Sequence, residues 1–346
     1  MTQKVKRITF LDGLRGIAIL VVVLFHSYAR WPQIVPYGDQ YASIQIFRYG
    51  WLGVYLFFMI SGFVILMTLE KTTNFFEFLF RRWLRLFPAM LIISILVFFT
   101  AGSIFPERPA GVPVLRDLLP GLTFIEEDTW AKILYSPQGV LEGAFWSLFV
   151  EVKFYLIFGI VYFICGVNAA IASLVFLFML SVANAPFVWR FSSHFMGWFA
   201  AGALFYLYLK SSKRKWWIMG LIIAVLSAFF LSKGLDAKLA AIVMILFFAT
   251  VIMDNRAQSV LSFRLFVFLG FISYPLYLIH ENMMVALIVK IGRWMPWMPS
   301  FFMPVIPIAV VIGIAYLVAL YAEPKLREII RGVFNHKKAQ PERLIQ

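Results

Sequence analysis

The sequence is poor in the residues that most metal and disulfide sites require. It contains one cysteine and four histidines. A single cysteine can form neither an internal disulfide nor a cysteine-based metal site, and the histidines show no ligand-like spacing, so we predict no metal cofactor. Charged residues make up only 14% of the chain, and no glycine-rich phosphate loop is present. These absences argue against a metalloenzyme and against a P-loop or Rossmann nucleotide-binding protein.

Apolar residues are abundant instead. They account for 62% of the chain, and aromatic residues for 18%, which is outside the usual composition of soluble globular domains. The net charge of +14 comes from short basic clusters between apolar runs, so we expect no nucleic-acid partner. The composition predicts an integral membrane protein surrounded by membrane lipids.

Ten stretches meet or nearly meet the length and hydropathy needed to cross a bilayer. They are residues 9–28, 50–69, 87–105, 144–164, 168–185, 195–209, 216–232, 238–253, 265–288 and 303–322. With the amino terminus inside, lysine and arginine favour the cytoplasmic connections by roughly two to one. We therefore predict an all-α fold, a polytopic membrane helix bundle of about ten transmembrane helices with both termini in the cytoplasm. Residues 1–324 would form this domain, and 325–346 a short basic cytoplasmic tail.

The connections contain two notable segments. Lys4, Lys6 and Arg7 precede the first span, which we interpret as a retained helix because no small-residue cleavage site follows it. The long connection 106–143 contains the apolar piece 115–125, which is too short to cross the bilayer and too apolar for a free loop. We expect this piece to lie in the membrane interface, covering the outer mouth of the bundle.

The first span carries three ionisable residues, Asp12, Arg15 and His26. Eleven helical steps bring His26 to within ~20° of Arg15 around the axis and ~16 Å along it. Ionisable groups inside a membrane are costly unless they meet a partner or a cavity. One interpretation is a structural Asp12–Arg15 ion pair and a hydrogen-bonded histidine; the other is that Arg15 holds an anionic donor while His26 accepts a proton.

Arg81, Arg82 and Arg85 precede the third span on its predicted cytoplasmic side. Ordinary positive-inside flanking explains most such clusters. Arg82 and Arg85, however, lie three residues apart and project together from a helix, which suits a phosphorylated ligand such as a nucleotide or coenzyme A.

Further polar residues lie within apolar sequence. Glu151 and Lys153 point ~160° apart on a helix, so each needs its own partner, and Glu151 is either structural or a functional carboxylate. In the ninth span, Tyr274, Tyr277 and His280 lie within two turns, and we expect them to line a polar cavity.

Taken together, these segments resemble the acyltransferase-3 family of bacterial integral-membrane O-acyltransferases. The matching motifs are, in order, L-D-G-L-R-G-I-A with R-x10-H from Arg15 to His26, F-F-M-I-S-G-F at 57–63, R-x-x-R from Arg82 to Arg85, F-W-S-L-F-V-E at 145–151, S-Y-x-x-Y-L-x-H at 273–280 and E-P at 323–324. The chain departs from many relatives where Lys153 replaces a neutral amide. We expect a stand-alone enzyme, without the extracytoplasmic hydrolase-like domain that some relatives append.

The resemblance implies a function and a set of site residues. The donor would be cytoplasmic acyl-CoA, expected to be acetyl-CoA, and the acceptor a hydroxyl of a carbohydrate or glycolipid such as a surface polysaccharide, lipopolysaccharide or lipid-linked glycan. His26 would act as general base or acyl carrier. The expected residues are His26, Arg15 and Glu151 for catalysis; Arg81, Arg82, Arg85 and Arg15 for the donor; and Asp12, Trp146, Tyr274, Tyr277 and His280 for the acceptor.

The resemblance also implies a bacterial cytoplasmic (inner) membrane protein and leaves a homo-oligomer open. The alternative function is a proton-coupled transporter or exporter of a glycolipid or glycan, in which the same histidine, arginine and glutamate would form a proton relay. No internal repeat of the kind common in transporters is visible in the sequence.

Overall fold

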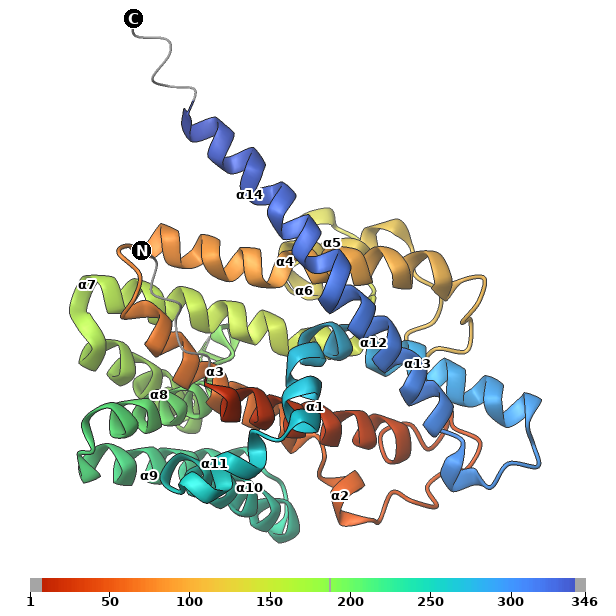
Figure 1. Ribbon diagram of the computed structural model, residues 1–346, viewed down its shortest axis with the longest axis horizontal. Coiled ribbons are helices and arrows are strands. Elements are labelled where there is room, and N and C mark those ends of the chain that lie inside the picture. The colour runs from red at the N-terminus through yellow and green to blue at the C-terminus, as the bar shows by residue number, and fades with distance from the viewer. Residues whose placement is uncertain (1–7, 187, 340–346) are drawn as a thin grey trace, which may run out of the picture. The chain divides into compact units, whose positions relative to one another are not determined.

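The computed structural model of the protein describes residues 8–186 and 188–339 (Figure 1). These residues form helices and connections, with no strand among them. The helices are α1 Thr9–Tyr28, α2 Gln45–Arg48, α3 Leu52–Leu69, α4 Phe75–Ala101, α5 Leu118–Thr123, α6 Glu127–Leu134, α7 Trp146–Val182, α8 Met196–Ser211, α9 Arg214–Leu231, α10 Leu235–Met253, α11 Asn255–Leu261, α12 Arg264–Trp294, α13 Val305–Leu317 and α14 Glu323–Ala339. The predicted all-α membrane bundle is confirmed.

Within the described ranges, eight helical segments are long and apolar enough to cross a membrane. The difference from the predicted ten has two causes. The expected spans 144–164 and 168–185 are the two arms of α7, which lie on either side of Gly166, where the backbone is not helical (φ 81°, ψ 178°), and which form one continuous segment. Figure 1 shows the bend in α7. The expected span 195–209 is helix α8, which has only 16 residues. Lys4, Lys6, Arg7 and the end of the predicted tail, 340–346, lie outside the described residues.

The chain divides into two compact units. Unit 1 comprises the described residues up to Phe80 and Ala144–Ser273, and unit 2 comprises Arg81–Gly143 and the described residues from Tyr274 onward. Helices α4 and α12 therefore contribute to both units. The predicted boundary at residue 324 stays a prediction.

Unit 1 is organised around α3, which packs against α1 and α8. Glycines allow the close approach to α8: a Cβ atom on Gly62 would lie 2.0 Å from the carbonyl oxygen of Phe199, and one on Gly202 would lie 1.9 Å from that of Met59. Lipid is as apolar as leucine, so helices in membranes associate through such close van der Waals packing. Aromatic rings fill the neighbouring space, with Phe154 stacked on Phe199 at 4.1 Å.

Glycines also hold α1 in place within unit 1. A Cβ atom on Gly13 would lie 1.9 Å from the carbonyl oxygen of Leu261, and one on Gly16 would lie 2.1 Å from that of Phe266. Both glycines belong to the L-D-G-L-R-G segment that also carries Asp12 and Arg15. The small residues of this motif thus fix the helix that presents its polar side chains.

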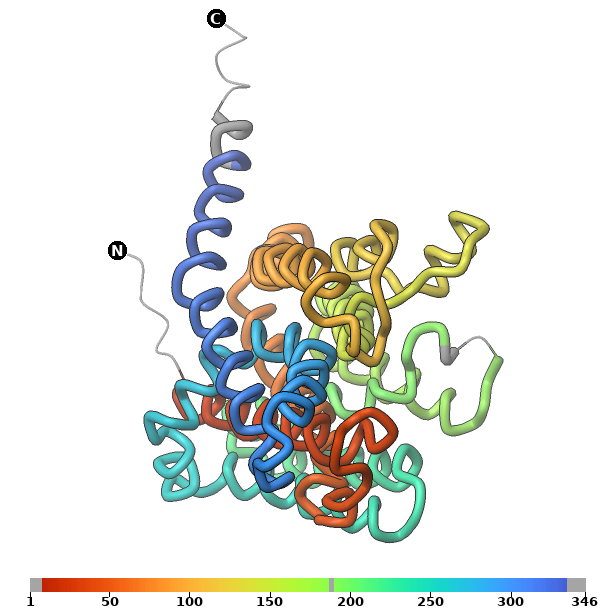
Figure 2. The backbone as a smooth tube through the Cα atoms, turned by 90° about the vertical axis from the view of Figure 1, so that its right-hand side faces the viewer, coloured from red at the N-terminus to blue at the C-terminus, as the bar shows by residue number. Residues whose placement is uncertain are grey.

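Unit 2 contains the long connection and the C-terminal helices. The connection forms a 3-10 turn, Leu115–Asp117, followed by α5 and α6. Apolar side chains of this segment are exposed, including Leu115 at 72%. The position of 115–125 in the membrane interface, over the outer mouth of the bundle, stays a prediction. At the other end of the chain, α13 continues through a π-helical segment, Val318–Ala322, into α14 as one long rod (Figure 2).

The glycine contact between α3 and α8 yields a stability prediction. We expect Gly202→Ala to lower the free energy of unfolding by about 1–3 kcal/mol, because the added methyl group meets backbone atoms that cannot move aside cheaply. Thermal unfolding of the purified protein in detergent measures the effect. Gly313→Ala is the matched control, since a Cβ atom there meets nothing within 4 Å; it should be neutral or slightly stabilising. Equal unfolding temperatures for the two variants would contradict the role given to Gly202.

Candidate active site

The polar face of α1 begins with an ion pair. Asp12 is buried at 8% exposure, and its Oδ1 lies 3.3 Å from Nη1 of Arg15. The side chain of Arg15 keeps 27% exposure. The predicted i, i+3 pair therefore exists, and the arginine still presents part of its guanidinium surface.

His26 lies near the C-terminal end of the same helix. Its Nδ1 is 2.9 Å from the carbonyl oxygen of Val22. A carbonyl oxygen can only accept a hydrogen bond, so Nδ1 carries the proton in the neutral ring and Nε2 carries the lone pair. The ring is part-buried and contacts Phe25 edge-on, with centroids 5.0 Å apart. The helix thus holds His26 in the tautomer in which Nε2 can accept a proton.

Glu151 on α7 accepts two hydrogen bonds within unit 1. Ser61 donates from its hydroxyl at 2.6 Å and Tyr155 from its phenol at 2.5 Å, both to Oε1. Lys153 has different partners, donating to the carbonyl oxygen of Arg190 at 2.8 Å and to the Ser192 hydroxyl at 3.3 Å. The two charged residues are therefore satisfied separately, as their helical spacing predicts.

Trp146, at the start of α7, packs among aromatic rings of unit 1. Its ring lies 5.2 Å from Phe195 and 6.2 Å, edge-on, from Phe58. The indole keeps 39% exposure. An acceptor-binding role for Trp146 stays a prediction.

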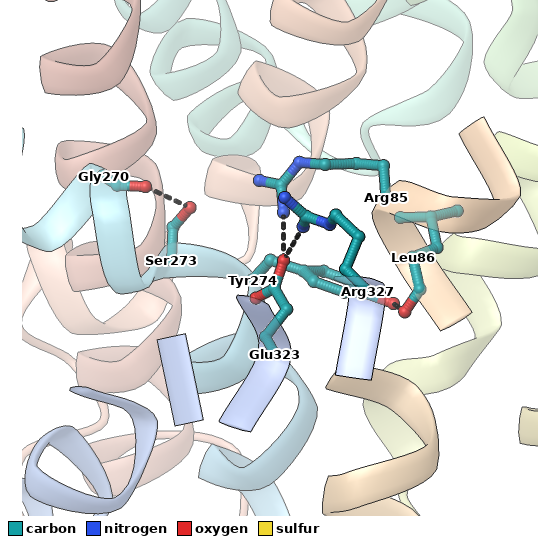
Figure 3. Close-up of polar contacts among 7 residues, drawn as sticks. All are labelled: Arg85, Leu86, Gly270, Ser273, Tyr274, Glu323 and Arg327. Carbon is teal, nitrogen blue, oxygen red and sulfur yellow. Dashed lines mark hydrogen bonds and ion pairs between the residues drawn. The ribbon is translucent and has the colours of Figure 1, made fainter. Parts of the chain in front are cut away.

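In unit 2, Arg85 of α4 meets Glu323 at the start of α14 (Figure 3). Nη1 of Arg85 lies 3.2 Å from Oε1 of Glu323, and Arg327 donates to the same oxygen. The guanidinium of Arg85 also lies over the ring of Tyr274, 5.7 Å from its centroid, and the Tyr274 hydroxyl donates to the carbonyl oxygen of Leu86 at 2.9 Å. The predicted donor residue Arg85 and acceptor residue Tyr274 thus lie together.

The neighbouring arginines differ in environment. Arg81 is exposed, whereas Arg82 is half-buried, and its Nε atom has no hydrogen-bond partner among the described residues. Trp83 stacks on Phe87 with centroids 4.6 Å apart, one turn along α4. The predicted pair Arg82 and Arg85 therefore lies on the less exposed side of the helix.

Tyr277 and His280 lie deeper in α12. Tyr277 has 6% exposure and His280 none. Nδ1 of His280 is 2.9 Å from the carbonyl oxygen of Tyr277, and the two rings are 5.4 Å apart. They form one buried cluster, and their predicted contact with the acceptor stays a prediction.

No group of three or more histidine, cysteine, aspartate or glutamate residues in the described ranges could hold a metal ion. Comparison with known proteins shows that the profile of the acyltransferase-3 family, an acyltransferase domain, matches residues 8–322.

The chain belongs to the acyltransferase-3 family. Among curated relatives, it is similar to the O-acetyl transferase of Shigella phage Sf6, with 29% identity over 43% of this chain and 44% of the phage protein. It is also similar to the O-acetyltransferase OatA of Staphylococcus aureus (strain NCTC 8325 / PS 47), with 30% identity over 44% of this chain and 24% of OatA. The matches span less than half the length of these relatives. No solved structure matches the chain.

The structure of this acyltransferase-3 protein also shows a polar cluster that the sequence analysis missed. Glu142, fully buried just before α7, accepts hydrogen bonds from the backbone and side-chain amides of Asn282, at 3.0 and 2.8 Å. The Asn282 side chain in turn accepts from the backbone of Ala110 at 3.0 Å. Arg108, at 3% exposure, donates to the carbonyl oxygen of Leu141 at 2.5 Å. The long connection is thus bound to α12 through buried polar groups.

The surroundings of Glu142 change its acidity. Burial raises the pKa of Glu142 to about 8, with a further rise from the negative charge of Glu281 and an opposing effect of Arg108 and Asn282. Glu142 is therefore mainly protonated at neutral pH. The only available signal in the sequence was a glutamate placed directly before an apolar span.

The raised pKa predicts how stability depends on pH. Between pH 4.5 and about 8, the folded protein binds a proton at Glu142 that the unfolded chain has lost, so the free energy of unfolding falls as pH rises. The slope from this group is at most about 1.4 kcal/mol per pH unit. We expect Glu142→Gln to remove this slope, measured as the unfolding temperature against pH. Asp128→Asn, which neutralises an exposed carboxylate of the same connection, should leave it unchanged; identical pH profiles for wild type and Glu142→Gln would contradict the assignment.

Proposed function

We propose that this protein is a membrane O-acetyltransferase that moves an acetyl group from acetyl-CoA to a hydroxyl of a carbohydrate acceptor. Membership of the acyltransferase-3 family supports acyl transfer, and the names of the phage and staphylococcal relatives favour acetyl as the group. Carbohydrates are the acceptor class implied by the resemblance, and they offer the hydroxyl groups that O-acetylation needs.

The observation that carries the mechanism is the hydrogen bond between Nδ1 of His26 and the carbonyl oxygen of Val22, at 2.9 Å. It fixes the tautomer in which Nε2 can accept a proton, and it holds the ring against rotation. An orienting hydrogen bond to the second ring nitrogen is the arrangement expected for a histidine general base.

In the proposed reaction, the transfer of the acetyl group starts at Nε2 of His26. Nε2 of His26 takes the proton of the acceptor hydroxyl as its oxygen attacks the thioester carbonyl carbon. The carbon–sulfur bond breaks, the thiolate of coenzyme A leaves and takes up the proton, and the acetyl group remains on the acceptor oxygen as an ester. In a second route, Nε2 attacks the thioester carbonyl carbon, the carbon–sulfur bond breaks and coenzyme A leaves as the thiolate, so that His26 carries the acetyl group. The acceptor hydroxyl then attacks this acetyl carbon, its proton passes to the thiolate, and the carbon–nitrogen bond breaks to restore neutral His26.

Other residues of unit 1 have supporting roles in the proposal. Arg15 retains exposed guanidinium surface beside Asp12, and we assign it to an anionic part of the donor. Glu151 accepts from Ser61 and Tyr155, an arrangement that would hold its carboxylate in one orientation. In unit 2, Arg82 and Arg85 are assigned to the donor phosphates.

The location of the protein completes the proposal. A bacterial cytoplasmic membrane, with both termini in the cytoplasm, would give the basic residues of α4 access to cytoplasmic acetyl-CoA. The acceptor would be a surface polysaccharide or a lipid-linked glycan.

The proposal predicts that His26→Ala lowers acetyl transfer by about 10²–10⁴-fold, the usual contribution of a general base. Membranes containing the variant are given radiolabelled acetyl-CoA, and label is measured in the glycan fraction. His194→Ala is the matched control, because it removes another part-buried histidine of unit 1 that has no assigned role. Undiminished transfer by His26→Ala would eliminate His26 both as the general base and as the acetyl carrier. If wild-type membranes transfer no acetyl group from acetyl-CoA, the assignment of acetyl-CoA as the donor is refuted.

A further inference from the structure

One contact in unit 2, between Arg85, Arg327 and Glu323, suggests a binding site because its carboxylate and its guanidinium groups differ in exposure. Both arginines donate to Oε1 of Glu323 (Figure 3). The side chain of Glu323 is 7% exposed, whereas those of Arg85 and Arg327 are 41% and 28% exposed. The carboxylate is therefore buried, and the two guanidinium groups it holds reach the surface.

The positive charge of this cluster exceeds what Glu323 can neutralise. Arg331 lies close enough to Arg327 to repel it electrostatically, as does Arg85. Three guanidinium groups and one carboxylate leave these four side chains with an excess of two positive charges. Among the described residues, the Nε atoms of Arg82 and Arg327 also have no hydrogen-bond partner. The cluster can therefore accept an anion that offers several oxygen atoms.

The backbone around the cluster is suited to hold it in a defined geometry. Glu323 follows directly on the π-helical segment Val318–Ala322, and such segments occur frequently at functional sites. On the other side, the ring of Tyr274 lies beneath the guanidinium of Arg85. Arg85 is thus fixed by a carboxylate and by an aromatic face.

We propose that Arg327 joins Arg82 and Arg85 in a clamp for a phosphate group of the acyl donor, with Glu323 as the positioning residue that aligns Arg85 and Arg327. Guanidinium groups suit phosphate because their planar N–H donors match two of its oxygens at once. Each arginine uses one of its five N–H donors on Glu323 in the contacts described, so donors remain for the ligand. Arg327 lies beyond residue 322, where the family match ends. The inference rests on the proposed acetyl-CoA donor.

The test measures binding of coenzyme A to the purified full-length protein in nanodiscs of zwitterionic lipid. We expect Arg327→Ala to weaken binding by about 10–100-fold, because it removes charge-assisted hydrogen bonds to the phosphate group. Arg327→Lys should restore part of the affinity, since lysine keeps the positive charge but lacks the planar set of N–H donors that lets a guanidinium group bind two phosphate oxygens at once. Lys325→Ala, which removes an exposed positive charge from the same helix, should stay within about twofold of wild type. Glu323 keeps Arg85 as a partner in Arg327→Ala, and equal unfolding temperatures verify the fold.

A lipid headgroup offers the same phosphate chemistry, so a second arm repeats the measurement in nanodiscs of anionic phosphatidylglycerol. If Arg327→Ala reduces retention of phosphatidylglycerol while coenzyme A binding is unchanged, the cluster binds lipid and the proposal is overturned. If Arg327→Ala binds coenzyme A as well as Lys325→Ala does, the role of Arg327 in binding phosphate is refuted, while the assignment of acetyl-CoA as the donor is unaffected. If the wild-type protein binds no coenzyme A, the donor assignment fails as a whole.

The positioning role of Glu323 is tested by a double-mutant cycle. If Glu323 acts through Arg327, Glu323→Gln combined with Arg327→Ala should bind coenzyme A no more weakly than the weaker of the two single variants. If the losses of coenzyme A binding free energy in the two single variants add in the double variant, Glu323 does not act through Arg327.

Discussion

An ionisable side chain within an apolar helix bundle needs a partner, and this constraint governs the polar structure of the protein. Asp12 meets Arg15, Glu151 accepts from Ser61 and Tyr155, and Glu323 is shared by two arginines. Each buried carboxylate is thereby fixed in one orientation. The same groups that would destabilise the bundle when unpaired are therefore held by specific partners.

Close helix packing supports this arrangement in unit 1. The glycines of α1 and α3 leave no space for a side chain at their contacts, so the helices that carry Arg15, His26 and Ser61 are held by backbone atoms. A residue held in this way needs little reorganisation when it reacts, which is a condition for efficient acid–base and electrostatic catalysis. Packing and chemistry therefore depend on the same short motifs.

Much of the candidate site could be predicted where it depends on local spacing. The Asp12–Arg15 pair follows from an i, i+3 relationship, and the separate partners of Glu151 and Lys153 follow from their divergent directions on α7. Residues whose partners lie far away in sequence were harder to interpret. Glu142 was missed because its environment comes from Arg108 and Asn282, and Arg327 because its partner Arg85 lies on α4.

The sequence by itself determined the fold class, the membrane location and the common face of Arg15 and His26. Hydropathy and helical periodicity are local properties, and they do not depend on which helices meet. Only the tertiary structure decided that the two arms of α7 are joined at Gly166 and that Glu142 is buried. It also decided that one carboxylate serves both Arg85 and Arg327, because such contacts depend on how distant helices pack.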